Sequence, residues 1–427
     1  MGFTAALFDM DGTLLDSMDV WAQVDDDFLS ARGIATPPDY GAALAGLDFR
    51  QSAEYTRARF QLSESIDEII AGWNSLCMVQ YEQRVPLKPG AAAYLRFLKR
   101  HGVKIAAATA LEPHLFMPAL KRLGIAHLFD AFATVGETGV RKDTGATYLL
   151  AAQRLGVAPE DCIVFEDILE GHIGARAAGM RSCNVYDRHA DKKRSEINAI
   201  ADFFTRDFRT GVPCPEGCTL WDRAVIIPAW CDLALNAELI RPGDCVIAAD
   251  RGCVLCRESG IEPDFCVGDF DSLLPGEAIP AGAIVHPREK DDTDTLLALK
   301  TALEAGLTDI VLMGGIGGRL DHSLANLQLM RWADARGASI TIRTSQGTAR
   351  LLRPGMHRLP VNDGSGDALF SLLAFSPEVT GVTITGARYC VENAVLTDDY
   401  PLGISNVAPG GAEVSVSFAE GRLLLIF

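Results

Sequence analysis

Short apolar runs recur along the first half of the chain, and each ends near a polar residue before an amphipathic stretch begins. These runs have the length of buried strands and occupy residues 4–8, 103–109, 162–167 and 181–186. Strands that alternate with helices are typical of a parallel sheet that is covered by helices on both faces. The pattern therefore predicts that residues 1–208 form an α/β domain with a doubly wound, Rossmann-like sheet.

The segment between the first two runs is too long for an ordinary connection between a strand and a helix. Within it, residues 65–83 carry their apolar side chains at helical spacing, which predicts a long amphipathic helix. We expect residues 16–86, approximately, to form a helical cap over the sheet. A further helical pattern covers residues 192–204 near the end of the domain.

The second half of the chain repeats the α/β pattern after a connection. Residues 209–222 gather Gly, Pro, Cys and charged residues without periodicity, which is typical of a linker. A second α/β domain is predicted over residues 223–340 from apolar runs at 245–250, 265–269 and 309–315. Beyond it, residues 341–427 are predicted to form a small antiparallel β-sandwich or barrel, because apolar and polar residues alternate in segments such as 339–344, 381–386 and 413–418.

Length and composition agree with several folded domains. A chain of 427 residues, 48% of them hydrophobic, is too long for one ordinary core and carries no low-complexity tract. The formal charge of −17 disfavours nucleic acid as a partner, because nucleic-acid binding requires a basic surface. The first residues lack the basic start of a signal peptide, no apolar run reaches membrane-spanning length, and the 11 cysteines are scattered. We therefore expect a cytoplasmic protein without a membrane partner.

Two acidic residues follow the first predicted strand directly. Asp9 and Asp11 precede Gly12 and Thr13, so both carboxylates and free backbone N–H groups face the crevice beyond the strand. An ionised carboxylate can attack phosphorus, and a second carboxylate can protonate the leaving oxygen and later activate water. Taken by itself, this motif could also be an ordinary polar junction between a strand and a turn. Further polar residues at later strand ends and helix starts, namely Thr109, Lys142, Glu166 and Asp167, favour a phosphotransfer site.

With these motifs in this order, residues 1–208 resemble the haloacid-dehalogenase-like hydrolases that carry a helical cap after the first motif. The resemblance implies a nucleophile at Asp9 and a general acid/base at Asp11. It also implies that Thr109 and Lys142 hold the phosphoryl group. A Mg²⁺ site is implied at Asp9, Asp11, Glu166 and Asp167. A phosphomutase would share the same first step, and that alternative stays open.

Acidic residues are denser in the second α/β domain, where they lie at predicted strand ends and helix starts. Six of them are Asp250, Asp269, Asp271, Asp291, Asp294 and Asp321. Asp291 or Thr293 could merely cap the helix that follows, but capping does not explain six acids. Carboxylates that share one crevice repel one another unless a divalent cation and its phosphates join them. Residues 314–318 add a glycine-rich turn, whose N–H groups can approach phosphate oxygens, and Arg319 follows it.

The segments 263–272, 287–299 and 314–330 read PDFCVGDFDS, PREKDDTDTLLAL and GGIGGRLDHSLANLQLM, and in this order they resemble thiamine pyrophosphokinases. The resemblance covers residues 223–427, approximately. It implies a kinase that transfers pyrophosphate from ATP to the hydroxyl of thiamine and releases AMP, with Mg²⁺ as cofactor and ATP as co-substrate. It also implies a homodimer formed through the C-terminal half.

The same resemblance assigns individual residues. Carboxylates for Mg-ATP are implied at Asp250, Asp269, Asp271, Asp291 and Asp321, with Asp294 close to the reaction. Contacts with phosphates or nucleotide are implied at Lys290, Gly317, Gly318, Arg319 and His322. Ser405 and Asn406 are implied on the thiamine side.

The fusion itself motivates a substrate for the first domain. Hydrolysis of thiamine monophosphate would give thiamine, which the second domain then pyrophosphorylates. A sugar phosphate or a damaged thiamine precursor is an alternative phosphomonoester, and the motifs do not choose among these. A different alternative is that one half is a non-catalytic binding or dimerisation module, although both halves keep their acidic residues.

Overall fold

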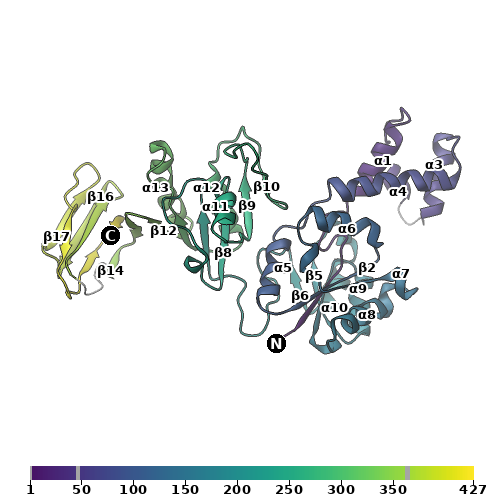
Figure 1. The fold of residues 1–427 in the computed structure, drawn as a ribbon, viewed down its shortest axis with the longest axis horizontal. Coiled ribbons are helices and arrows are strands. Elements are labelled where there is room, and N and C mark those ends of the chain that lie inside the picture. Colours follow the sequence, from purple (N-terminus) through teal and green to yellow (C-terminus); the bar gives the residue numbers. More distant parts are fainter. Residues whose placement is uncertain (1, 45–48, 361–365) are drawn as a thin grey trace. The chain divides into compact units, whose positions relative to one another are not determined.

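The structure is a computed structural model that describes residues 2–44, 49–360 and 366–427. The chain divides into two compact units, residues 1–220 and residues 221–427 (Figure 1). Each unit has its own sheets and its own hydrophobic cores.

A six-stranded sheet forms the centre of the first unit, in the order β3-β2-β1-β4-β5-β6. Its strands are β1 (Ala5–Phe8), β2 (Lys104–Thr109), β3 (Ala131–Thr134), β4 (Cys162–Glu166), β5 (Arg181–Val185) and β6 (Phe203–Thr205). All neighbouring strands are parallel, which confirms the predicted doubly wound sheet. The crevice of such a sheet lies where the connections diverge, between β1 and β4.

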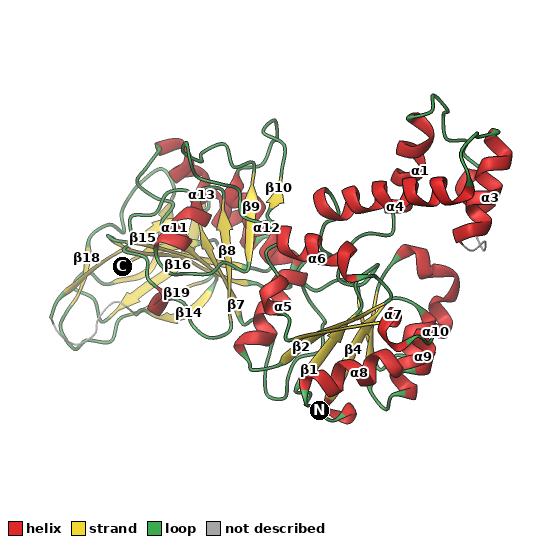
Figure 2. Ribbon diagram, turned by 45° about the vertical axis from the view of Figure 1, so that its right-hand side comes forward, coloured by secondary structure: helices red, strands yellow, loops and turns green. Residues whose placement is uncertain are grey.

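Helices cover both faces of this sheet (Figure 2). Ala6 and Phe8 of β1 pack into one core with α5 (Ala91–Arg100) and α6 (Pro113–Arg122). Ala5 and Leu7 point to the opposite face and pack with α8 (Ala146–Leu155) and α9 (Leu169–Ala177). Both faces of β1 are therefore buried, which explains why its sequence is continuously apolar. The short helix α7 (Val135–Thr138) follows β3.

One predicted helix of this unit is shorter than expected. α10 (Arg194–Ile200) ends before the last residues of the pattern over 192–204, and β6 begins at Phe203. Asp202 explains the change, because its carboxylate accepts a hydrogen bond from the Ser182 N–H at 2.7 Å. This bond draws the chain alongside β5. The outer strands β3 and β6 were not predicted.

The cap consists of helices inserted between β1 and β2. They are α1 (Val20–Ser30), α2 (Tyr40–Leu44), α3 (Phe49–Phe60) and α4 (Ile66–Gln83). The long helix predicted over 65–83 is confirmed as α4. It begins with a capping box, in which the Ser65 side chain accepts the Glu68 N–H and the Glu68 side chain accepts the Ser65 N–H.

The second unit is built on a ten-stranded sheet in the order β10-β9-β8-β7-β11-β12-β13-β20-β15-β18. Its parallel part contains β7 (Arg223–Ile227), β8 (Asp244–Ala249), β9 (Phe265–Gly268), β10 (Ile284–Val285), β11 (Asp309–Met313) and β12 (Ser339–Thr344). The helices of this part are α11 (Gly252–Glu258), α12 (Asp294–Glu304) and α13 (Leu320–Asp334). β7 lies between β8 and β11, so the connections diverge at its carboxyl end.

The same sheet continues into an antiparallel sandwich. One wall adds β13 (Gly347–Leu352), β20 (Leu423–Ile426), β15 (Ala368–Ala374) and β18 (Asn406–Ala408). The other wall is a four-stranded sheet of β14 (Gly355–Arg358), β19 (Ser415–Phe418), β16 (Glu378–Thr385) and β17 (Val391–Thr397). Buried side chains of both walls, such as Leu372 and Val416, form one core.

Two details of the second unit differ from expectation. β7 was not predicted, although it is a central strand of the sheet. The segment 339–344 was assigned to the antiparallel part, but β12 pairs in parallel with β11 and only then turns back onto β13. Its alternating pattern arises because Ile340 and Ile342 are buried on one face while the other face is partly exposed. Among the described residues, no helix has the length and apolar character needed to cross a bilayer.

The close contact between Gly90 and Phe208 gives a test of packing in the first unit. Gly90 has φ +79°, and a Cβ there would lie 2.6 Å from the backbone carbonyl carbon of Phe208, whereas Gly102 has φ +73° and open space around it. We expect Gly90→Ala to lower the free energy of unfolding by about 2–4 kcal/mol and Gly102→Ala by about 1 kcal/mol, because only the first adds a backbone clash to the strained φ. Denaturant titration followed by circular dichroism measures both values. Equal losses would contradict the tight packing at Phe208.

Candidate active sites

The carboxylates of the first unit meet where β1 and β4 end. Asp9 follows β1 and is 6% exposed, and Asp167 follows β4 and is 2% exposed. Gly12 has φ +74°, and a Cβ there would lie 2.4 Å from Asp167 Oδ2, so the turn requires glycine. The Thr13 hydroxyl donates to Asp167 Oδ1 at 2.8 Å. The strand ends and this turn therefore fix the two acids beside each other.

Asp9, Asp167 and Glu166, the last residue of β4, could share a cation. One carboxylate oxygen each from Asp9, Glu166 and Asp167 lies within 4.8 Å of the other two. Lys142 Nζ lies 2.5 Å from Asp9 Oδ1 and also contacts Glu166. One lysine offsets only part of the negative charge of three carboxylates. Burial raises the pKa of Asp9 to about 6, against the opposing effect of Lys142, and raises the pKa of Asp167 well above its ordinary value.

Glu166 supports this interpretation most directly. It is fully buried, and its Oε1 accepts a hydrogen bond from the Tyr148 hydroxyl at 2.6 Å. Its Oε2 is also buried and has no hydrogen-bond partner among the described residues. A buried carboxylate oxygen without a donor is costly unless a cation binds it. The donor set of oxygen atoms fits Mg²⁺.

Asp11 is not a member of this trio, and residues of the cap segment hold it. Its Oδ1 accepts hydrogen bonds from the Ser17 hydroxyl at 2.6 Å and from the Tyr81 hydroxyl. Tyr81 belongs to α4 and is 2% exposed, and the Arg122 guanidinium donates to its carbonyl oxygen at 3.3 Å. Burial raises the pKa of Asp11, although these hydroxyls oppose the rise. The cap thus contacts the residue that resemblance makes the general acid/base.

Sequence reasoning missed Ser17 and Tyr81. In the sequence, Tyr81 has the features of a core residue, because it lies on the apolar face of a predicted helix. No neighbouring residue in the sequence indicates that its hydroxyl contacts Asp11. Thr109, which was predicted, is 1% exposed at the end of β2, next to β1 in the sheet. Its Oγ1 accepts the Leu111 N–H at 3.1 Å.

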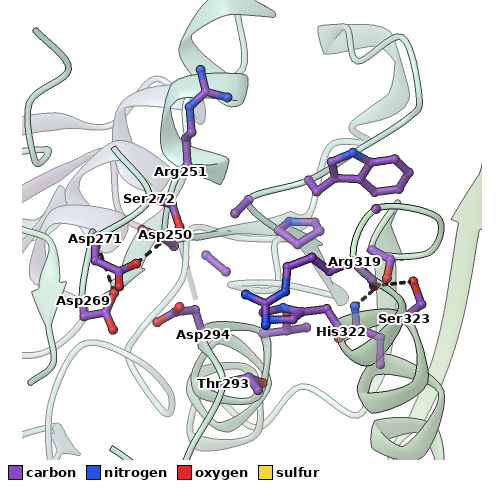
Figure 3. A pocket seen from close by; sticks show the side chains of 18 residues that line it. Asp250, Arg251, Asp269, Asp271, Ser272, Thr293, Asp294, Arg319, His322 and Ser323 are labelled. Atoms are coloured by element: carbon purple, nitrogen blue, oxygen red, sulfur yellow. Dashed lines mark hydrogen bonds between the residues drawn. The ribbon is translucent and has the colours of Figure 1, made fainter. Parts of the chain in front are cut away.

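The second unit holds a pocket of about 480 Å³ at the carboxyl ends of its parallel strands. Its walls include the backbone or side chains of Asp250, Asp269, Asp271, Asp294, Gly315, Gly318, Arg319 and His322. Figure 3 shows Asp250, Asp269 and Asp271 on one side and Arg319 with His322 across from them. A side lined with carboxylates therefore faces a side rich in hydrogen-bond donors.

Asp250, Asp269 and Asp271 form a second trio of carboxylates, with one oxygen of each within 4.8 Å of the others. Asp250 is 2% exposed, and its Oδ1 is buried without a hydrogen-bond partner among the described residues. Its φ is +51°, and Phe270, between the other two acids, has φ +58°. Such backbone conformations are costly for residues other than glycine. The trio and its orphaned oxygen fit a divalent cation.

Lys290 is the cation nearest to this trio. It contacts Asp269 and lies 3.2 Å from Asp294 Oδ1. Burial, the largest single influence, raises the pKa of Asp269, but the hydrogen bond and charge of Lys290 together with the hydrogen bond from the Asp271 N–H keep that pKa below its ordinary value. The pKa of Asp294 is raised by burial. Lys290 therefore bridges Asp294 to the predicted cation site.

Two predicted carboxylates lie further out. Asp291 and Asp321 are exposed and are not among the described residues that line the pocket. Asp321 pairs with Arg319 at 2.6 Å, and that guanidinium lowers the pKa of Asp321 to about 2. Thr293, and not Asp291, caps α12, because its side chain accepts the Leu296 N–H. The Gly317 N–H donates to the Ser323 hydroxyl at 3.0 Å.

Ser405 directly precedes the edge strand β18, and Asn406 is the first residue of that strand. Ser405 is exposed and has φ +59°. Asn406 is buried, its Nδ2 donates to the Tyr389 carbonyl at 2.8 Å, and its Oδ1 accepts the Tyr389 N–H at 3.1 Å. The Asn406 side chain thus holds the Tyr389 loop, and a direct contact of either residue with thiamine stays a prediction.

Comparison with known proteins gives a different family for each half. The haloacid dehalogenase-like hydrolase family model matches residues 3–179. The models of the thiamin pyrophosphokinase catalytic domain and of its vitamin B1 binding domain match residues 237–342 and 356–423.

Individual relatives divide in the same way. Thiamine pyrophosphokinase from Bacillus subtilis is 33% identical over 186 residues, which are 42% of this chain and 85% of that protein. Hexitol phosphatase B from Escherichia coli is 30% identical over 187 residues, which are 42% of this chain and 81% of that protein. The crystal structure of thiamine pyrophosphokinase from Bacillus subtilis has a TM-score of 0.42 at 29% identity and covers 48% of this chain and 98% of its own.

The position of Glu166 gives a test of the first site. A Cβ on Gly171, in α9, would lie 2.2 Å from Glu166 Cδ, whereas Gly179 just beyond the helix has open space. We expect Gly171→Ala to reduce Mg²⁺-dependent release of phosphate from p-nitrophenyl phosphate by about 100-fold, because Glu166 must move away from the trio. Gly179→Ala serves as the control and should keep its rate. Unchanged activity in Gly171→Ala would show that the position of Glu166 is not needed.

Proposed function

The chain belongs to the haloacid dehalogenase-like hydrolases through its N-terminal half and to the thiamin pyrophosphokinases through its C-terminal half, and from this we propose two enzymes of one pathway. The C-terminal enzyme transfers pyrophosphate from ATP to thiamine. The N-terminal enzyme is a phosphatase that supplies thiamine from thiamine monophosphate.

The kinase assignment is carried by the trio of Asp250, Asp269 and Asp271 inside the 480 Å³ pocket. These residues hold Mg²⁺ in our proposal, with Asp291 and Asp321 as outer contacts. Bound there, the ion neutralises negative charge on the phosphates of ATP. Lys290, Arg319 and His322 bind phosphate oxygens, and the glycines 317 and 318 let the chain approach them.

Asp294 is the residue best placed to handle the proton of the thiamine hydroxyl. It lines the pocket, and burial raises its pKa, so it is a better proton acceptor than an exposed aspartate. Lys290 contacts it at 3.2 Å and can hold its orientation. The hydroxyl oxygen then attacks the β-phosphorus of ATP, and AMP leaves.

In the phosphatase, Asp9 attacks phosphorus and Asp11 protonates the leaving oxygen. Lys142 and Thr109 hold the phosphoryl oxygens, while Asp9, Glu166 and Asp167 bind Mg²⁺, with Asp11 nearby. Asp11 then takes a proton from the water that hydrolyses the aspartyl phosphate. Ser17 and Tyr81 keep the Asp11 carboxylate in place during both proton transfers.

The fusion to a thiamine kinase supports thiamine monophosphate as the substrate, because its hydrolysis product is the acceptor of the second reaction. A sugar or hexitol phosphate is the second candidate. It is favoured by the likeness of residues in the first half to a hexitol phosphatase, at 30% identity. Both candidates are phosphomonoesters, and in either case Asp9 attacks the phosphorus.

A homodimer through the C-terminal half is the third part of the proposal. The segments around β18 expose a set of large apolar side chains, here called the β18 patch: Leu369, Tyr389, Tyr400, Leu402 and Ile404, each at least 50% exposed. Hydrogen bonds hold these segments together, since the Leu372 N–H donates to the Gly403 carbonyl at 2.9 Å. An exposed apolar patch of this kind is typical of a protein interface.

The central test incubates the full chain with Mg²⁺, ATP and thiamine monophosphate and follows phosphate, AMP and thiamine diphosphate. We expect thiamine diphosphate to appear. Asp9→Asn should abolish its formation from the monophosphate but keep conversion of thiamine, and Asp269→Asn should stop conversion of thiamine but keep release of phosphate. Each variant removes one carboxylate charge and so serves as the control for the other.

The outcomes separate the parts of the proposal. If thiamine is converted but the monophosphate is not, the kinase stands and the phosphatase substrate is wrong. Release of phosphate from a hexitol phosphate but not from thiamine monophosphate would favour the second candidate. If wild-type protein does not convert thiamine, the kinase assignment fails.

The dimer has its own test by sedimentation velocity. Leu369→Glu places a charge in the β18 patch, and we expect it to shift the dimer to monomer, because burying an unpaired carboxylate is costly. Met356→Glu alters a side chain that is 80% exposed on β14, in the other sheet, and should stay dimeric. A monomeric wild type, or a dimeric Leu369→Glu variant, would contradict this interface.

A further inference from the structure

The loop after β7 brings a large aromatic side chain into the kinase pocket. Trp230 is 42% exposed and lines the pocket together with Asp250 and Gly318. It stands three residues beyond the end of β7, which is Ile227, at the crevice where the connections of the sheet diverge. This is the place where doubly wound sheets bind their ligands.

One face of the Trp230 indole is covered by the glycine-rich turn. A Cβ built on Gly318 would lie 3.1, 3.1 and 3.3 Å from the indole atoms Cδ2, Cγ and Cδ1. Nearly equal distances to three ring atoms mean that Gly318 approaches the flat face of the ring. A Cβ on Gly317 would lie 2.8 Å from Cη2. These two glycines therefore leave room for the indole.

The backbone that carries the ring is also fixed in position. The Gly315 N–H donates to the Trp230 carbonyl oxygen at 3.1 Å, and the Asn326 side chain donates to the Gly315 carbonyl at 2.7 Å. A Cβ on Gly314 would lie 2.7 Å from the Cα of Cys231, so the two loops pack closely. A ring held in this way can bind a flat ligand with little loss of side-chain entropy.

We propose that the open face of Trp230 is the surface on which the adenine ring of ATP stacks; this rests on the proposed kinase function. Trp230 packs against Gly318, which directly precedes Arg319, and Arg319 lies across the pocket from the carboxylate trio (Figure 3). A nucleotide that spans the pocket places its phosphates between the trio and Arg319, and its base at the indole. Stacking on tryptophan accepts any planar base.

Thiamine also has flat aromatic rings that can stack on tryptophan. The position of the predicted thiamine-side residues argues against thiamine as the ligand of the Trp230 face. Ser405 and Asn406 lie at the start of β18 in the sandwich and are not among the described residues that line the pocket. The test must nevertheless separate the two ligands.

The experiment uses the full chain and three probes with Mg²⁺: α,β-methylene-ATP, which has the base but cannot release AMP; inorganic tripolyphosphate, which lacks the base; and thiamine. In Trp230→Leu, we expect affinity for α,β-methylene-ATP to fall by roughly 5- to 150-fold, which corresponds to about 1–3 kcal/mol for a lost base stack. Affinity for tripolyphosphate and the KM for thiamine should stay unchanged. Trp230→Phe keeps an aromatic face and should lose less.

Fluorescence gives a readout that does not need turnover. α,β-Methylene-ATP should quench tryptophan emission in the wild type and in Trp332→Phe, a control at the far end of α13, but not in Trp230→Phe. An equal loss of affinity for tripolyphosphate in Trp230→Leu would overturn the proposal, because Trp230 would then only support the glycine-rich turn. A raised KM for thiamine alone would also overturn it. If wild-type protein binds α,β-methylene-ATP with quenching but does not convert thiamine, the kinase function fails while the stacking role stands.

Discussion

Repulsion among closely spaced carboxylates is the constraint on which both sites depend. Each unit brings three acids so close that one oxygen of each lies within 4.8 Å of the others, and each trio has one lysine against it, Lys142 or Lys290. A single positive charge does not balance three negative ones. Each trio also contains a buried carboxylate oxygen without a donor among the described residues, at Glu166 and at Asp250. A divalent cation resolves both problems at once.

The order of the strands puts the acids there. In the first unit β1 and β4 are neighbours although the whole cap and two strands separate them in sequence, so Asp9 and Asp167 meet at adjacent strand ends. In the second unit, β8 and β9 are adjacent, so Asp250 meets Asp269 and Asp271. Parallel strands all present their carboxyl ends at one edge of the sheet, which gathers residues that are distant in sequence. The order of the apolar strands in the sheet therefore determines which acids meet at each site.

This relation also explains which features could be predicted from sequence. An apolar run that ends near a polar residue before a helical stretch is a local signal, and it led correctly to the doubly wound sheet of the first unit. β7 gave no such signal, because this short apolar strand ends at Ile227 and is followed by Pro228, Ala229 and Trp230. The sequence pattern places Tyr81 only on a helix face, since its bond to Asp11 spans 70 positions. The indole of Trp230 meets Gly317 and Gly318 only through the fold. Contacts of this kind follow from strand order, which local patterns do not contain.

Backbone strain links the second unit's fold to its chemistry. Among the described residues other than glycine, Gln61, Asp250, Phe270, Asn393 and Ser405 have φ between +49° and +59°. Gln61 directly follows a helix, and asparagine tolerates this region, so those two need no special account. Each of the other three costs about 1–2 kcal/mol. The Asp250 N–H donates to the Val267 carbonyl at 2.9 Å, so pairing with β9 helps to hold the strained residue. Strain at Asp250 and Phe270 therefore adds to the repulsion among the adjoining carboxylates. The fold keeps both the strained backbone and the close carboxylates. A bound cation explains why both occur at the same residues.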